Sequence, residues 1–530
     1  MKMDNFKVTI NDLPVEVILG ILARLDIVSL KNSCLVCRKW NEIIESSAET
    51  MKNFVLNLDA ERLKKFDANF QSRRKHLSVF IHFEKENEKL LDHVENFDLS
   101  QVRRVSFNRY KSSIHIRKVR KVLSRMPMLE DASLMLNHVD SVKRNWPLRL
   151  ENLKRIRFFP KSSNALTLFS PKKIVEVRIE ESPIDDNIEK VVGFLQRTIN
   201  LKILRVNKFT FNAIFEHERN FSFQLRTVDM LYNSTQVAAV VNENFAKFLR
   251  SQTLSLKVLD LSGLEGLSEA VHRTIFNQMN ELEKLTIDGA FLPNMKQFYE
   301  ILKPNKSLKS VKILKNFSSD DAAKGILVNL PELEKLELEF SISSKINLIA
   351  RHMPKLKDFS YSTVLRPCAK ELKFNSLTSF SVLHIVDLND WLAIINSSPN
   401  IKSLSVFWVD ENDAEKIVEY SKWNSNIQNL KLIGNYNSIN LVLNKLKVHH
   451  GCLRSIELAV KMRPSSPIMA ELKVQFDQIN RNIQQEKKFL AQCVWTEICN
   501  GPACNGLNDI IKFKFETKNI VTVLPWQLLL

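Results

Sequence analysis

The sequence predicts an α/β fold: a curved parallel sheet on the inside, helices on the outside, and a small three-helix unit in front of both. Two observations carry this prediction. A six-residue frame, apolar-x-x-apolar-x-apolar, recurs along most of the 530 residues, and apolar residues at helical spacing follow it. Near the N-terminus, by contrast, a stretch of about 35 residues has helical spacing without the frame.

The N-terminal stretch covers residues 11–46 and contains three short helical segments. Its first apolar positions fall three or four residues apart and share one helix face: Val15, Ile18, Leu22 and Leu25. Pro14 suits the start of that helix, where its missing N–H costs nothing, and Asp12 is placed to cap the free amides. Residues 26–30 follow as a turn or short helix. A further amphipathic helix runs through Val36, Trp40 and Ile43 or Ile44.

Such a short unit buries little core by itself, so it is expected to pack against something else. It cannot hide all of its large apolar side chains, among them Ile21, Leu22, Val36 and Trp40. The stretch resembles an F-box in the order and spacing of Leu13, Pro14, Glu16, Ile18, Ile21, Leu22, Leu25, Leu30, Val36, Cys37, Arg38 and Trp40. The alternative interpretation is a generic helical cap on the domain that follows.

An F-box implies docking onto a Skp-type adaptor, which joins the protein to a cullin–RING ubiquitin ligase. The resemblance places these residues in the adaptor interface: Leu13, Pro14, Glu16, Ile18, Ile21, Leu22, Leu25, Leu30, Val36 and Trp40. Protein interfaces depend on a few central apolar residues. The candidate anchors are Leu13, Pro14, Ile18 and Leu22.

The recurring frame dominates the rest of the chain. It begins at Val102, Leu129, Leu153, Ile174, Leu201, Leu225, Leu256, Leu282, Leu308, Leu333, Leu356, Leu377, Ile401, Ile427 and Leu453. These fifteen starts are separated by about 25 residues on average, the period of leucine-rich repeats. Because one strand–helix unit cannot bury its apolar side alone, the units are expected to stack side by side.

The repeats resemble the leucine-rich repeats that are often found behind an F-box. One departure concerns the position three residues past the last apolar residue of the frame, which is commonly Asn or Cys in such repeats. Here it is Asn only at Asn233, Asn316 and Asn435. The polar ladder that regularises such stacks is therefore expected to be incomplete.

Residues between the apolar strand positions are expected to point into the concave face. They are rich in arginine in the early repeats and in serine in the late ones. The candidate target-binding residues are Arg104, Arg155, Arg157, Arg178, Arg205, Ser379, Ser381, Ser403, Ser405 and Phe407. The early arginines could suit a phosphate, since Arg forms bidentate pairs with phosphate oxygens.

These patterns predict four segments. Residues 8–48 form the F-box, 49–100 a joint and N-terminal cap with two short strands, 101–460 about fifteen repeats, and 461–530 a C-terminal cap helix and tail. The cap is expected to contain one long helix from Met469 to about Trp495 and a strand from Ile510 to Phe515. The apolar end of the chain could also reach into the concave face.

The sequence offers no constellation of catalytic residues. It has only 10 glycines and lacks the GxGxxG and GxxxxGK[ST] phosphate loops, HExxH and GxSxG. Cys34 and Cys37 have metal-ligand spacing but are expected to lie inside one helix of the F-box, with no second pair at a zinc-like distance. We therefore expect no enzyme activity, no cofactor, no metal and no small-molecule substrate.

Charge and cysteine content limit the partners and the compartment. A net charge of +18 suggests an acidic partner or nucleic acid. The densest basic run, Arg117–Lys121, is interrupted at helical spacing as on a solvated helix face, so nucleic acid is the weaker alternative. The seven cysteines are thinly spread, and neither a signal peptide nor a long apolar segment is present. We expect a protein of the cytoplasm, the nucleus or both, without membrane attachment.

Together, the resemblance and the repeats predict a substrate receptor of an SCF (Skp–cullin–F-box) ubiquitin ligase. The F-box would dock the adaptor, and the repeats would hold a protein target for ubiquitination. The alternatives are a leucine-rich-repeat scaffold that does not promote degradation and a binder of acidic partners or nucleic acid through the basic early repeats. The sequence does not identify the target.

Overall fold

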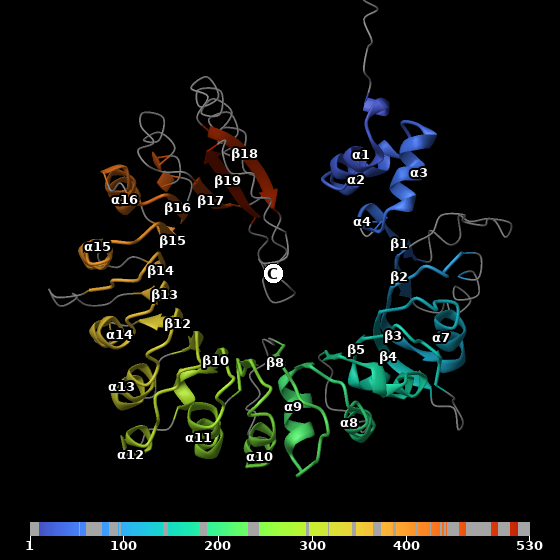
Figure 1. The fold of residues 1–530 in the computed structure, drawn as a ribbon, viewed down its shortest axis with the longest axis horizontal. Coiled ribbons are helices and arrows are strands. Elements are labelled where there is room, and N and C mark those ends of the chain that lie inside the picture. The colour runs from blue at the N-terminus through green and yellow to red at the C-terminus, as the bar shows by residue number, and fades with distance from the viewer. Residues whose placement is uncertain are drawn as a thin grey trace, which may run out of the picture. The chain divides into compact units, whose positions relative to one another are not determined.

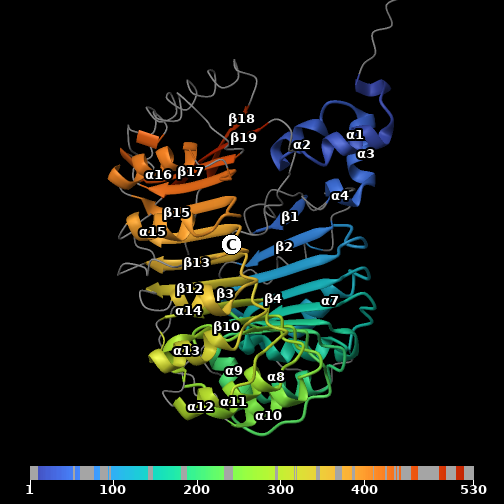
Figure 2. The same ribbon diagram turned by 60° about the vertical axis from the view of Figure 1, so that its left-hand side comes forward.

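The computed structural model describes residues 10–51, 54–59, 77–83, 94, 97–140, 147–180, 188–231, 243–264, 266–292, 296–315, 317, 319–341, 346–363, 373–384, 388–409, 411–423, 426–434, 437–438, 441–442, 455–462, 489–496 and 509–517. The chain divides into two compact units, Met1–Asn233 and Ser234–Leu530. Each unit combines a parallel sheet with helices along one of its faces (Figures 1 and 2).

The first unit begins with short helices. They are η1 (Ile10–Asp12), α1 (Val15–Leu22), α2 (Ile27–Ser33), α3 (Arg38–Ser46) and α4 (Ala48–Met51). Pro14 precedes α1 as its N-cap and makes no side-chain capping bond, and Asp12 lies in η1, so its predicted capping of α1 stays a prediction. Asp26 caps α2 by accepting hydrogen bonds from Val28 N and Ser29 N, at 2.8 and 3.0 Å. The hydroxyl of Ser29 also bonds this carboxylate, and these bonds lower the pKa of Asp26.

Eight parallel strands follow in the first unit. They are β1 (Val55–Leu58), β2 (Ser78–Phe83), β3 (Arg104–His115), β4 (Asp131–Asp140), β5 (Arg155–Phe158), β6 (Glu176–Ile179), β7 (Ile203–Val206) and β8 (Thr227–Met230). Each strand pairs in parallel with the next one along the chain. Helical segments connect several of them: α7 (Ile116–Leu123), η3 (Pro160–Leu168), η4 (Pro171–Lys173), α8 (Ile188–Gln196) and α9 (Lys208–Phe215).

The second unit continues the same pattern. Its parallel strands are β9 (Val258–Asp260), β10 (Lys284–Asp288), β11 (Ser310–Leu314), β12 (Lys335–Ser341), β13 (Asp358–Thr363), β14 (Ser379–His384), β15 (Ser403–Val409), β16 (Asn429–Gly434) and β17 (Ser455–Met462). Its helices are α10 (Glu243–Ser251), α11 (Glu269–Asn277), η5 (Gly289–Phe291), α12 (Lys296–Glu300), α13 (Asp320–Val328), α14 (Ile346–His352), α15 (Leu388–Asn396) and α16 (Glu411–Trp423).

Every one of the fifteen predicted frames coincides with a strand, from β3 to β17, which confirms the repeat assignment. In each of β5 to β8 the second and fourth residues are buried, and the first and third are half-buried. The parallel ladder also includes β1 and β2, which lie in the predicted joint. The strand pattern therefore begins before residue 101.

Backbone hydrogen bonds join neighbouring repeats in a recurring way. The carbonyl just before a strand accepts from two consecutive amides at the start of the next repeat. Lys154 O, for example, accepts from Val175 N at 2.8 Å and Glu176 N at 3.0 Å. The same arrangement occurs at Leu77, Arg103, Glu130, Val175 and Lys202 of the first unit, and at Lys257, Glu283, Lys309, Glu334, Lys357, Thr378 and Lys402 of the second. The predicted asparagine ladder at Asn233, Asn316 and Asn435 lies outside the described residues.

The C-terminal end differs from the sequence prediction. Residues 489–495, expected at the end of a long helix, belong to strand β18 (Phe489–Thr496), and the rest of that predicted helix lies outside the described residues. The predicted strand at 510–515 is confirmed as part of β19 (Asp509–Thr517). β19 pairs antiparallel with both β17 and β18. β19 therefore covers the backbone edge that β17 would otherwise leave unpaired, and β18 adds one further strand. The apolar end of the chain, 524–530, is outside the described residues.

In the described part of the chain, none of the helices has the length and hydropathy that spanning a bilayer requires.

Gly325 tests the packing between successive outer helices. It lies in α13, and an added Cβ would overlap Cβ of Tyr299 on α12. We predict that Gly325→Ala lowers the free energy of unfolding by about 1–3 kcal/mol, measured by urea denaturation, because overpacking forces the helices apart. Gly193→Ala in α8 is the control: no atom lies within 4 Å of its added Cβ, so a gain of about 0.5–1 kcal/mol is expected from helix propensity. Equal effects of the two substitutions would contradict this packing.

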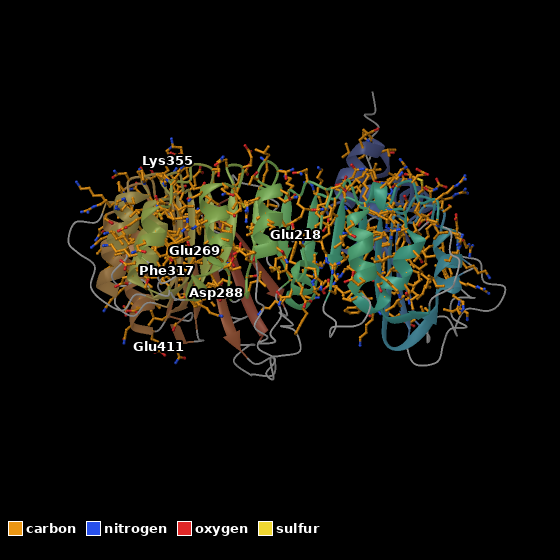
Figure 3. All side chains as sticks on the ribbon, turned by 90° about the horizontal axis from the view of Figure 1, so that it is seen from below. Glu218, Glu269, Asp288, Phe317, Lys355 and Glu411 are labelled. Atoms are coloured by element: carbon orange, nitrogen blue, oxygen red, sulfur yellow. The ribbon has the colours of Figure 1, made fainter. Side chains whose placement is uncertain are left out.

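We expect His272 to make the stability of the second unit sensitive to acid. It is buried in α11, the helix that also carries Glu269, which is labelled in Figure 3. Its Nδ1 donates to Ser268 O at 3.0 Å, and its ring packs edge-on against the ring of Phe298. Burial lowers the pKa of His272 to about 4, against an ordinary value of 6.5. The unfolded chain therefore takes up a proton at a higher pH than the folded chain does.

The stabilising effect of a neutral His272 is complete above pH 6.5 and is lost as the pH falls toward 4, by up to about 3 kcal/mol. We expect His272→Gln, which keeps a donor for Ser268 O but does not titrate, to reduce this loss in urea unfolding curves recorded between pH 7 and 4.5. If the wild type and the variant lost stability in parallel, His272 would not be the group responsible.

Candidate functional site

The helices of the N-terminal stretch have a core of their own. Its buried members are Ile18, Leu22, Leu30, Ile43, Ile44, Met51 and Phe54, and Leu13, Leu19, Leu25, Ile27, Cys34, Trp40 and Leu77 pack around them. Trp40 Nε1 also donates to Asn11 Oδ1 at 2.7 Å, which ties η1 to α3. The helices therefore hold each other through side chains that no partner protein has to cover.

The same helices leave many apolar side chains uncovered. Of the fourteen large hydrophobic residues that are exposed among the described residues, half lie between 10 and 36: Ile10, Val15, Val17, Ile21, Val28, Leu35 and Val36. Val17 and Ile21 stand one turn apart on α1, so they share a face of that helix. Leu35 and Val36, between α2 and α3, are 85% and 62% exposed. We call these seven residues the exposed apolar set.

The ten residues that the sequence assigned to the adaptor interface fall into three groups. Ile18, Leu22 and Leu30 lie inside the core, at most 1% exposed, and support the helices from within. Leu13, Leu25 and Trp40 are half-buried against that core. The exposed members, which a partner can reach directly, are Pro14, Glu16, Ile21 and Val36. Apolar spacing alone does not show which residues of a short segment are exposed. The sequence-based interface therefore lacked five members of the exposed apolar set: Ile10, Val15, Val17, Val28 and Leu35.

Cys34 and Cys37 do not share a helix. Cys34 is the C-cap of α2 and Cys37 the N-cap of α3, so the expectation that both lie inside one helix is wrong. Both thiols are free and half-buried. No cluster of three or more potential metal ligands occurs within the described ranges.

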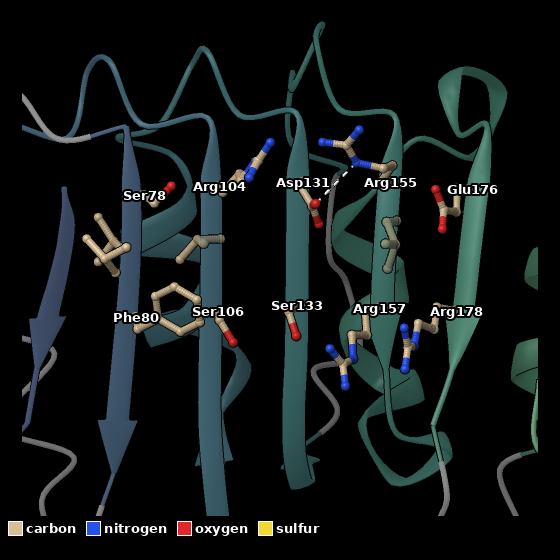
Figure 4. A pocket seen from close by; sticks show the side chains of 14 residues that line it. Ser78, Phe80, Arg104, Ser106, Asp131, Ser133, Arg155, Arg157, Glu176 and Arg178 are labelled. Atoms are coloured by element: carbon tan, nitrogen blue, oxygen red, sulfur yellow. Dashed lines mark hydrogen bonds and ion pairs between the residues drawn. The ribbon is translucent and has the colours of Figure 1, made fainter. Parts of the chain in front are cut away.

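A second candidate site is an open hollow of about 420 Å³ on the sheet of the first unit (Figure 4). Side chains from β1 to β6 line it in rows that follow the strand register. One row contains Val55, Ser78, Arg104, Asp131, Arg155 and Glu176. The next contains Phe80, Ser106, Ser133, Arg157 and Arg178, and Arg205 of β7 continues it. Four of the five arginines that the sequence singled out thus line one surface.

Carboxylates hold some of these arginines in place. Arg155 Nε donates to Asp131 Oδ2 at 3.1 Å on the neighbouring strand. Arg205 Nε lies 3.3 Å from Glu176 Oε1 and 3.6 Å from Asp229 Oδ2. These pairs are partly exposed, so they contribute little to stability. They do fix the direction in which the side chains extend.

Arg157 and Arg178 share one acidic partner. Arg178 Nε donates to Glu180 Oε1, and Arg157 Nε lies 2.6 Å from the same oxygen. Glu180 follows β6 directly, and its side chain is only 14% exposed, while those of Arg157 and Arg178 are more open. One carboxylate thus lies against two guanidinium groups on adjacent strands, and it is hydrogen-bonded to that of Arg178.

The late-repeat candidates lie in the second unit. Ser379 is in register with Ser403, and Ser381 with Ser405, across β14 and β15. Phe407 is covered by Lys431, whose Nζ lies 5.7 Å from the ring centroid. The structure therefore groups the serines together on their own unit, and their role in binding a target stays a prediction.

Sequence reasoning missed the residues at the apolar end of the hollow. Val55 and Phe80 are both exposed, on β1 and β2. The sequence placed these strands in a joint, so their side chains were not projected onto the repeat surface. The signal was present as the alternation of Val79, Ile81 and Phe83, which leaves Phe80 on the opposite side of the strand.

Comparison with known families identifies an F-box-like domain at residues 10–56. No curated protein sequence matches the chain. Among solved structures, the leucine-rich repeat-containing protein LegL7 from Legionella pneumophila is 15% identical over 53% of this chain and 89% of its own, with a TM-score of 0.31. A chain from the crystal structure of a TLR13–ssRNA13 complex is 13% identical, over 71% of this chain and 57% of that chain, with a TM-score of 0.35.

These TM-scores are too low to carry an argument, so the repeat architecture rests on the chain's own strand register. The chain is an F-box-like domain followed by a leucine-rich-repeat type of solenoid, in which parallel strands alternate with helices. The family match covers the helices and the first two residues of β1, and it does not extend to the strands that follow.

Proposed function

We propose that this chain is the substrate-recognition subunit of an SCF-type ubiquitin ligase. The F-box-like domain binds a Skp-type adaptor, and the repeats hold a protein target. The observation that carries the proposal is the exposed apolar set. It gathers half of the large hydrophobic residues that are exposed in the described part of the chain into 27 residues of the F-box-like domain. Apolar side chains concentrated in this way favour a protein partner.

The division between core and surface supports this role. The core of Ile18, Leu22 and Ile44 holds the helices together, and Val17, Ile21, Leu35 and Val36 remain available to a second protein. Covering such side chains contributes about 25 cal/mol per Å² of apolar surface removed from water. A few of them at the centre of an interface are enough to dominate its affinity.

The chain itself does no chemistry in this proposal. A substrate receptor acts by holding its target near a ubiquitin-conjugating enzyme, which raises the local concentration of the reacting groups. The repeats supply a wide surface of mixed charge for the target. The adaptor and the cullin–RING assembly supply everything that transfers ubiquitin.

The proposed adaptor interface is best tested by substituting exposed residues and measuring capture of the adaptor, because such substitutions do not disturb the core. Ile21→Asp and Val36→Asp each place a charge in the proposed interface, and we expect each to weaken the capture of a purified Skp-type adaptor at least about tenfold. Ile199→Asp, at an exposed isoleucine between α8 and β7, is the matched control and should leave capture unchanged. Substituting Leu13 would be less informative, because Leu13 packs on the core and its loss also weakens the fold.

The same variants separate a ligase receptor from a scaffold. In cells, proteins that co-purify with the wild-type chain should be ubiquitinated, and ubiquitination should fall with Ile21→Asp and Val36→Asp while co-purification of the target persists. Equal adaptor capture by wild type and both variants would refute the proposed interface. Intact capture without any change in target ubiquitination or half-life would instead favour the scaffold.

A further inference from the structure

The residue directly before each strand lies at one edge of the sheet, and we call these residues the entry row. Successive members lie about 4.8 Å apart, because their strands are paired in register. In the first unit the entry row from β3 to β8 consists of Arg103, Glu130, Lys154, Val175, Lys202 and Arg226. In the second unit the row from β9 to β13 consists of Lys257, Glu283, Lys309, Glu334 and Lys357.

Opposite charges alternate along the entry row of the second unit. Lys257 Nζ lies 2.6 Å from Glu283 Oε1, and Lys357 Nζ lies 2.8 Å from Glu334 Oε2. Lys309 follows one glutamate in the row and precedes the other. The hydrogen bond from Lys357 lowers the pKa of Glu334, and the positive charge of Lys309 adds to this effect. From β9 to β13, each lysine of the row therefore has a glutamate beside it.

The first unit departs from this alternation between β5 and β8. Lys154, Lys202 and Arg226 are all exposed, and in the described part of the chain none of them takes part in an ion pair. Lys202 and Arg226 are direct neighbours, since β7 and β8 are paired in register. Like charges side by side on neighbouring strands are destabilising. The first unit thus keeps an unfavourable pair of a kind that the second unit avoids.

The acids of the adjoining segments are already paired. Glu151, in the turn before β5, accepts a hydrogen bond from Lys173. Glu130 lies 3.4 Å from Arg103, on the side of the row away from β5. Lys172 of η4 is exposed and makes no ion pair among the described residues, so it adds a cation beside β6, where the row itself has a valine. The edge from β5 to β8 therefore keeps an excess of positive charge.

Hydrogen bonds to the backbone hold this edge in place. Lys202 Nζ donates to Gln224 O at 3.2 Å, in the segment that leads to β8, so its ammonium group lies toward Arg226. Asn200 Nδ2 donates to Lys172 O at 2.6 Å, which ties the turn before β7 to η4. The cations are thus carried by segments that are bonded to the neighbouring repeat. A ligand finds them already lined up.

The length of this edge and its surroundings favour an acidic peptide over nucleic acid. Lys154 and Arg226 are three strand spacings apart, about 14 Å, which an extended peptide covers in four or five residues. Glu130 bounds the stretch on the β4 side, so a long backbone with regularly spaced phosphates would meet an acid there. Single strands also bind by stacking on aromatic side chains. Among the described residues, the exposed large aromatic side chain is Phe80 on β2, outside the entry row.

We propose that the entry row from β5 to β8 is a docking surface for an acidic segment of a partner protein, with three or more carboxylates within about five residues. The carboxylates pair with Lys154, Lys202 and Arg226, as glutamates pair with lysines in the row of the second unit. Binding neutralises the like charges that the fold leaves side by side. The surface uses no residue of the F-box-like domain, so this inference goes beyond the proposed function and does not depend on it.

The probe is a fluorescein-labelled peptide of about ten glutamates, and its binding to the full-length protein is measured by fluorescence anisotropy. We expect saturable binding at about 50 mM salt that weakens at least about fivefold at about 200 mM, because salt screens exposed charges. A peptide of glutamines of the same length should not bind. Failure of the glutamate peptide to bind, or equal binding of the two peptides, would overturn the proposal.

A charge reversal at Lys202 separates binding from stability. Lys202→Glu should weaken peptide binding at least about tenfold, and it should raise the urea midpoint of unfolding, because a carboxylate beside Arg226 restores the alternation. Lys309→Glu is the matched control: it makes the same change of charge in the row of the second unit, between two glutamates. It should lower the midpoint and leave peptide binding within about twofold of the wild type. An equal loss of binding in both variants would show a general charge effect and refute the site.

Two further measurements decide the remaining outcomes. Lys202→Gln/Arg226→Gln removes both charges without adding an ion pair and should also weaken peptide binding at least about tenfold. If Lys202→Glu fails to fold, as judged by circular dichroism, this pair decides. An oligothymidylate of the same length should bind more weakly than the peptide. If it bound more tightly and lost that binding in Lys202→Glu, the ligand would be nucleic acid and the proposal would be refuted.

Discussion

The backbone carbonyl that accepts from two consecutive amides, at the repeat junctions named above, is the interaction on which the rest depends. It accepts from the residue before the next strand and from the first residue of that strand, so at these junctions it fixes both the start and the register of the strand. A shift of one residue would move the apolar side chains of a strand to the opposite face of the sheet. Since the contact uses only backbone atoms, it tolerates repeats whose sequences have little else in common.

Because the strand register is fixed, polar residues that are distant in the sequence lie side by side on one surface of the sheet. Arg157 and Arg178 are 21 residues apart in the sequence, yet the ladder places them opposite each other on β5 and β6. Their shared partner Glu180 comes from the end of the same strand as Arg178. The F-box-like helices work differently, because a small side-chain core positions their exposed residues, and Phe54 and Leu77, next to β1 and β2, contribute to that core.

Much of the repeat architecture could be read from the sequence, since each frame carries its own local signal. Frames from Val102 to Leu453 all became strands, because alternating apolar residues and a following helix suffice to define each unit. The C-terminal strand β18 could not be foreseen in this way. Its pairing with β19 is a contact between distant segments, and such pairing overrides the helical pattern of residues 489–495.

The candidate sites were predictable to different degrees. The alternation of side chains along a strand was enough to place Arg155, Arg157 and Arg178 on one face. That the two guanidinium groups share Glu180 could not be predicted, because it depends on side-chain conformation. On the F-box-like helices, spacing identified which residues are apolar, but not that Ile18 and Leu22 face inward while Ile21 faces outward.

The central claim is that the exposed apolar set, and not the repeat surface, is where the adaptor binds. Hydrogen–deuterium exchange on the full-length chain, with and without a purified Skp-type adaptor, tests this directly. We expect slower exchange in the adaptor complex at residues 14–22 and 34–37, with no change in β3 to β6. Protection confined to the strands, or none along α1 and the turn before α3, would contradict it.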